Sequence, residues 1–147
     1  MDVVDLESKL PAETITAVAG DAHGLTDAVR QVYVAREDRG GRSNVASPEV
    51  WWSPADTVLD DKQRLGQSTW SRTYAALFRR TVSSRGAEAN ASFIAWERAF
   101  RAHFHGYRRP GGVTGLDRVT VDDVIINPQA SPASMAIRVT FHGEGDD

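Results

Sequence analysis

The most regular hydrophobic pattern of the chain lies between residues 90 and 106, where aromatic residues recur three and four positions apart. On an α-helix such positions share one face and form a stripe. The stripe consists of Phe93, Trp96, Phe100 and Phe104, widened by Ile94 and Ala99. We therefore predict a core helix packed on a sheet, with its N-cap at Asn90 or Ser92 and its C-cap at Gly106.

A weaker helical pattern near the start of the chain predicts a first helix from Val4 to Val18. Its apolar face would contain Leu6, Leu10, Ile15 and Val18. Pro11 interrupts this pattern, so the helix either kinks there or begins there.

Five segments carry the β-branched and aromatic residues or the period-two alternation of strands. They are residues 29–36, 49–53, 68–83, 118–127 and 134–142. The last alternates most regularly, with Met135, Ile137, Val139 and Phe141 on one face. In residues 118–127 we expect Val119, Val121 and Ile125 on one face. Val124 and Ile126 would then lie on the other.

Trp51 and Trp52 are adjacent, so on a strand they point to opposite faces and cannot both enter a one-sided core. One of them would face a second covering layer or a partner chain, or else lie flat under the following loop. Pro54 is expected to end this strand. We predict long loops at Glu37–Ser47 and Ala55–Gln67, and propose both as subunit or partner contacts.

The elements follow the order α-β-β-β-α-β-β, with strands in runs rather than alternating with helices. This order predicts an α+β fold with a mainly antiparallel sheet of about five strands and two helices packed on one face. The 147 residues fit a single domain, residues 1–147. Residues 143–147 form an acidic tail that we expect to fray.

Composition excludes some function classes. The chain has no cysteine, which rules out disulfides, thiolate metal sites and a cysteine nucleophile. Its net charge of −3 gives no overall attraction to nucleic acid. The N-terminal segment lacks the features of a signal peptide, and no apolar run would span a bilayer. We therefore expect a soluble protein that is made and used in the cytoplasm.

The polar residues provide no recognisable catalytic constellation. His103 and His105 lie about 200° apart on a helix and would not chelate one metal together. The carboxylates of Asp122 and Asp123 diverge on a strand. Asp56, Asp60 and Asp61 could hold a cation weakly, but a solvated loop is the simpler interpretation. We predict no enzyme activity, cofactor or metal site.

Two groups of arginines give local positive charge: Arg79, Arg80 and Arg85, and the pair Arg108 and Arg109. They would meet an acidic partner or pass near nucleic acid. The simpler alternative is that they are solvated ends of strands and loops.

The layout as a whole resembles the tail terminator and tail-completion (neck) proteins of long-tailed bacteriophages. The matching segments are LESKLPAETITAVAG, VRQVYVARE, VWWS, STWSRTYAALFRRTVS, ASFIAWERAFRAHFHG, VTVDDVIINP and SMAIRVTFHGE. The resemblance covers nearly the whole chain but is one of segment order and length, so no catalytic or binding motif is carried over. Pro11 and the segment Ala55–Gln67 depart from the family pattern.

The resemblance implies a structural virion protein that forms a ring, expected to be a hexamer, which caps the finished tail tube. The implied partners are copies of itself, the tail-tube protein and the head-completion or connector protein, with passing contact with DNA in the lumen. The implied location is the neck of the virion. Our candidate interface residues are Trp51, Trp52, Arg39, Arg42, Asp60, Asp61, Arg79 and Arg80. The alternatives are another head–tail connector or head-closure protein, a dimeric binding module, or a small enzyme whose site would be sought first at Asp56–Asp61.

Overall fold

The computed structural model describes residues 3–18, 29, 31–34, 49–64, 67–80, 86–106, 112–113, 115–127 and 133–144. For residues 31, 55–64, 67–70, 86–90 and 144 it describes the backbone alone. The predicted loop Glu37–Ser47 and the arginines Arg39, Arg42, Arg85, Arg108 and Arg109 lie outside these residues.

Two helices and five strands make up the described fold, and their order is the predicted α-β-β-β-α-β-β. The elements are α1 (Val3–Ala17), β1 (Gln31–Val34), β2 (Glu49–Arg64), β3 (Gln67–Arg80), α2 (Gly86–Phe104), β4 (Leu116–Asn127) and β5 (Ala133–Glu144). The strands form one sheet in the order β1-β2-β3-β5-β4. All neighbouring pairs are antiparallel except β1 and β2, which are parallel. The α+β prediction is therefore confirmed.

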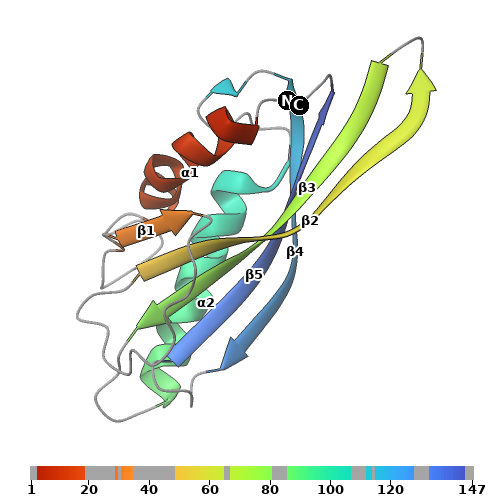
Figure 1. Ribbon diagram of the computed structural model, residues 1–147. Helices are drawn as coiled ribbons and strands as arrows, with labels where there is room; N and C mark the ends of the chain where they lie inside the picture. Colours follow the sequence, from red (N-terminus) through yellow and green to blue (C-terminus); the bar gives the residue numbers. More distant parts are fainter. Residues whose placement is uncertain are drawn as a thin grey trace.

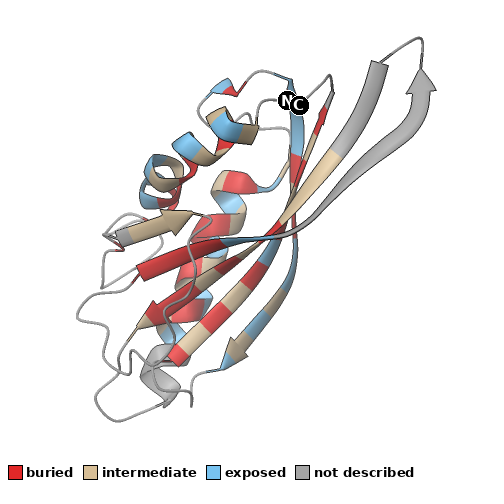
Figure 2. Cartoon of the chain, in the orientation of Figure 1, coloured by how far each residue is buried: buried red, intermediate tan, exposed pale blue. Residues whose placement is uncertain are grey.

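Both helices cover the same face of the sheet, here called the inner face (Figure 1). Alternate residues of the strands point into the core beneath the helices, as the alternating burial in Figure 2 shows. The core contains the predicted residues Met135, Ile137, Val139 and Phe141 of β5, all fully buried. Among the described residues, no helix is long and apolar enough to cross a membrane.

Helix α1 runs continuously through Pro11. Its buried residues are Leu6, Leu10, Thr14 and Ala17, which are spaced four, four and three positions apart. The prediction that Ile15 lies on the apolar face was wrong, because this residue is 39% exposed. Thr14 takes the central position instead, because its hydroxyl accepts a hydrogen bond from Nε1–H of Trp52 at 2.9 Å.

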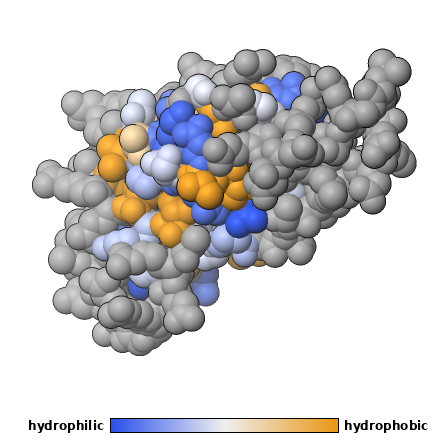
Figure 3. Space-filling model, turned by 45° about the horizontal axis from the view of Figure 1, so that its top comes forward, coloured by the Kyte–Doolittle hydropathy of each residue, from blue (hydrophilic) through white to orange (hydrophobic). Residues whose placement is uncertain are grey.

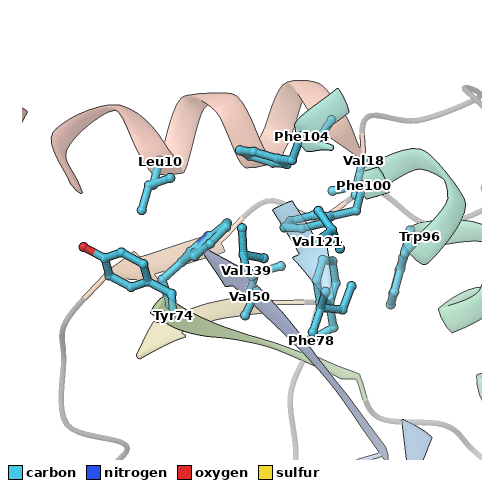
Figure 4. Close-up of a cluster of buried hydrophobic side chains, with 14 of the residues drawn as sticks. Leu10, Val18, Val50, Tyr74, Phe78, Trp96, Phe100, Phe104, Val121 and Val139 are labelled. Atoms are coloured by element: carbon cyan, nitrogen blue, oxygen red, sulfur yellow. The ribbon is translucent and has the colours of Figure 1, made fainter. Parts of the chain in front are cut away.

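Helix α2 buries the four aromatic rings of its predicted stripe, each at most 1% exposed, together with Ala99. The prediction that Ile94 widens this stripe was wrong, because Ile94 is 36% exposed. Figure 4 shows Trp96, Phe100 and Phe104 packed with core side chains of the sheet. The predicted N-cap was wrong, because the helix begins at Gly86, ahead of Asn90 and Ser92. Gly106 follows the helix with a φ of 110°, a conformation that favours glycine. Its N–H and C=O both bond to Val119 of β4, at 2.9 Å each.

The predictions that the strand ends at Pro54 and that Ala55–Gln67 is a loop were also wrong. Strand β2 continues through Pro54 to Arg64 and pairs with β3. The register shifts between Pro54 and Asp56, which accommodates a proline that cannot donate to the ladder. Polar composition concealed this strand, because residues 55–64 lack the hydrophobic alternation by which strands are recognised. Strand β5 likewise extends to Glu144, so residues 143 and 144 of the predicted frayed tail belong to the sheet.

A β-bulge in β4 changes which face its residues occupy. Val121 pairs with Val139, but Val124 pairs with Ile137, so β4 holds one extra residue between them. Val124 and Ile126 therefore pack against the core, whereas Ile125 is 70% exposed. The predicted faces were wrong beyond Val121, because strict alternation does not foresee an inserted residue.

We predict that Phe100→Ala lowers the free energy of unfolding by about 3–5 kcal/mol, because Phe100 is fully buried and truncation leaves a cavity. Chemical denaturation measures this change. The matched control on the same helix is Arg98→Ala, whose side chain is exposed, and its effect should stay within about 0.5 kcal/mol. A loss below about 1 kcal/mol for Phe100→Ala would show that the stripe does not form the core.

Candidate functional site

The face of the sheet opposite the helices, here called the outer face, carries a row of apolar side chains. The register aligns Tyr33 with Trp51, Trp51 with Leu77, Leu77 with Ala136, and Ala136 with Ile125. Since paired residues project to the same face, these five residues form one line across all five strands. We call this line the outer row.

One end of the outer row is packed within the chain. The ring of Trp51 lies 4.6 Å from that of Tyr33, between ring centroids, and the Arg79 guanidinium lies 5.6 Å from the centre of the Trp51 ring. Arg79 also forms an ion pair with Glu49 at 3.3 Å, and both side chains are buried. Trp51 is 7% exposed and Glu49 is fully buried. This end is therefore a covered cluster rather than a free surface.

The other end of the outer row, Leu77, Ala136 and Ile125, is more open, and we call it the open end. Leu77 and Ala136 are half-buried, and Ile125 is mostly exposed. Beside it lies a shallow hollow of about 190 Å³, lined by Ala75, Asp123, Ile125, Ala136, Ile137 and Arg138. Arg138 of β5 and Asp123 of β4 are exposed and lie where the register of the two strands shifts. The open end thus combines apolar surface with one charge of each sign.

A second uncovered apolar surface lies on α1. Val4, Ser8, Ala12 and Ile15 are all exposed and fall on one side of the helix, opposite its buried residues. We call these four residues the outer stripe. The side chain of Lys9 forms an ion pair with Asp5 at 3.2 Å along one flank. Figure 3 shows hydrophobic residues among hydrophilic ones on the described surface turned toward the reader.

The polar residues on the inner face hold α1 to the sheet. Tyr74 donates a hydrogen bond from its hydroxyl to Glu7 of α1 at 2.7 Å. Arg72 donates from Nε to the same hydroxyl at 2.6 Å and pairs with Glu7 at 3.2 Å. Burial, followed by the hydrogen bond to the Glu7 carboxylate, raises the pKa of Tyr74, so its hydroxyl stays protonated and keeps donating. This triad fixes the position of the helix.

His103 and His105 have separate partners in the structure. Nε2 of His103 lies 2.6 Å from Oε2 of Glu13, which joins the two helices. Nδ1 of His105 accepts the N–H of Val121 at 3.0 Å, beside the bulge. Burial, and next the charge of Arg118, lower the pKa of His142. Within the described part of the chain, no three His, Asp or Glu side chains gather as a metal site would require.

The eight candidate interface residues from the sequence fall into different environments. Trp52 is 1% exposed in the core, so it is removed from the candidate interface. Trp51 and Arg79 belong to the covered cluster. Arg80 contacts Ser92 and the ring of Trp96 on α2. Asp60 and Asp61 belong to β2, where the structure describes their backbone alone. Arg39 and Arg42 lie outside the described residues.

Sequence reasoning missed the open end. Ile125 was expected on the same face as Val119 and Val121, but it lies on the opposite face and is 70% exposed. The one signal in the sequence was the adjacent pair Asp122–Asp123, which breaks the apolar alternation where the bulge occurs.

We predict that Glu49→Gln and Arg79→Met each lower the free energy of unfolding by about 3–5 kcal/mol. Each substitution removes one charge of the buried ion pair and leaves the opposite charge buried without its counterion. The double variant should lose clearly less than the sum. Denaturation of all four proteins gives the coupling energy. A coupling below about 0.5 kcal/mol would mean that the two side chains act independently.

No protein-family model matches this chain, and no curated protein sequence matches it. The function proposed next therefore rests on the chain's own sequence and geometry.

Proposed function

We propose that the chain is a structural subunit of a bacteriophage neck, the tail terminator, which assembles into a ring on the end of the tail tube. The observation that carries this proposal is the long hairpin of β2 and β3. Figure 1 shows this hairpin extending well past both helices. Its strands have 16 and 14 residues, longer than the strands on either side.

The hairpin carries a long strand edge. Strand β1 pairs only with residues 49–52 of β2, whereas β2 continues to Arg64. Among the described residues, β3 is thus the single strand neighbour of β2 beyond Trp52. Unpaired backbone groups along an edge are a template for pairing with another chain. An element of this kind supports subunit contact rather than catalysis within one chain.

The mechanism is contact complementarity. Copies of the chain repeat one heterologous interface until a ring, proposed as a hexamer, closes. One face of the ring matches the last layer of the tail-tube protein and the other does not, so tube growth stops. The second face then receives the head-completion or connector protein. Each contact can be weak, because the tube end presents all its sites together and raises the effective concentration.

A head-closure or other connector protein is the second candidate, since the same hairpin and sheet would also serve there. The two functions differ in what their loss does to the tail. A terminator limits tail length, whereas a head-closure protein acts on the head and leaves tail length unchanged.

The test is deletion of the gene from its phage, followed by electron microscopy of the lysate. We expect filled heads without tails and free tails of irregular length, with normal virions restored by the gene supplied in trans. Free tails of normal length would instead identify a head-closure protein. Normal joined virions from the deletion would exclude both functions.

A further inference from the structure

The outer stripe and the open end face opposite directions on one subunit. Helix α1 lies on the inner face, and its outer stripe points away from the sheet, whereas the open end lies on the outer face. Two such surfaces cannot meet within a chain. A pair of copies can bring them together, and because the surfaces differ, each joined copy still presents one of them to the next.

We propose that the outer stripe of one subunit docks on the open end of the next, so that α1 covers the outer face of its neighbour's sheet. The occupant of the open end is thus a second copy of this chain. This inference deepens the proposed function, because it names the two halves of the repeating interface on which a ring depends.

Hydrophobic complementarity is the first argument. The four large hydrophobic side chains that are exposed in the described residues are Val4, Ile15, Ile94 and Ile125. Two of them belong to the outer stripe and one to the open end, and docking would remove all three from water. Val4 and Ile15 lie about 16 Å apart along the helix, whereas β3 and β4 lie two strand spacings, roughly 10 Å, apart on either side of β5. The outer stripe is therefore long enough to cross the open end.

Charge complementarity is the second argument and selects α1 as the partner. Asp5 and Lys9 flank the outer stripe on successive helical turns. Arg138 and Asp123 flank the hollow on neighbouring strands. The helix and the sheet thus each present one acidic and one basic side chain at the two surfaces. Docking can place Asp5 against Arg138 and Lys9 against Asp123, which sets the direction of the helix across the strands.

Disulfide trapping tests the contact directly, because the chain has no cysteine of its own. The full chain carrying Ile125→Cys is mixed with chains carrying Val4→Cys or Ile15→Cys, each at up to about 1 mM, and the mixture is briefly oxidised. At this concentration a contact with a Kd of about 1 mM is occupied in roughly two fifths of the chains. Mass spectrometry separates the mixed disulfide from each homodimer. Arg98→Cys, which is exposed on α2 outside the outer stripe, is the matched control.

We expect the mixed disulfide with Val4→Cys or Ile15→Cys to exceed both the Arg98→Cys product and the Ile125→Cys homodimer. Arg138→Glu should lower this yield at least about fivefold, and Asp5→Lys in the partner chain should restore it, because the charges then match again. Because these positions are exposed or partly exposed, we expect each variant to fold, and circular dichroism checks this.

Other outcomes overturn the inference. Preferential homodimers of Ile125→Cys would show a symmetric dimer, and yields equal to the control would show no specific contact between copies. The test is separate from the phage deletion. Trapping without the deletion phenotype would refute the terminator function alone, and the phenotype without trapping would refute this interface alone.

Discussion

The rest of the structure depends on the position of Trp52. Its ring packs against Tyr74 of β3, Phe141 of β5, and Phe100 and Phe104 of α2, with centroid distances of 5.6–6.0 Å. Its Nε1–H donates to Thr14 of α1. One buried side chain thus joins both helices to three strands. Because the outer stripe lies on α1 and the open end lies on the sheet, Trp52 also fixes the two proposed assembly surfaces relative to each other.

The link between α2 and β4 positions the open end in a similar way. Arg101 donates to the carbonyl oxygens of Val121 and Asp122 at 2.8 and 2.7 Å, and His105 accepts the N–H of Val121. These bonds satisfy backbone groups at the bulge, where the ladder to β5 is interrupted. The bulge in turn places Ile125 on the outer face. The end of α2 therefore stabilises the irregularity that creates the surface.

The sequence was sufficient for the features that depend on regular periodicity. The aromatic stripe of α2, the core face of β5 and the opposite faces of Trp51 and Trp52 all follow from helix or strand geometry. It was insufficient wherever a long-range contact overrides the local pattern. Thr14 takes the place of Ile15 in the core because its hydroxyl accepts the hydrogen bond of Trp52. Strand β2 continues beyond Pro54 because it pairs with β3. The bulge in β4 turns Val124 toward the core and Ile125 away from it. The open end depends on that bulge and so could not be predicted.

The central claim is that Trp52 joins α1 and α2 to the sheet as one cooperative unit, and hydrogen exchange in Trp52→Phe tests it most directly. The variant keeps an aromatic ring but loses the donor to Thr14 and part of the ring contacts. The account predicts that amides of α1, α2 and β5 lose protection together and by the same factor, as expected for a lower global stability. Loss of protection confined to α1, with α2 and β5 unchanged, would contradict it.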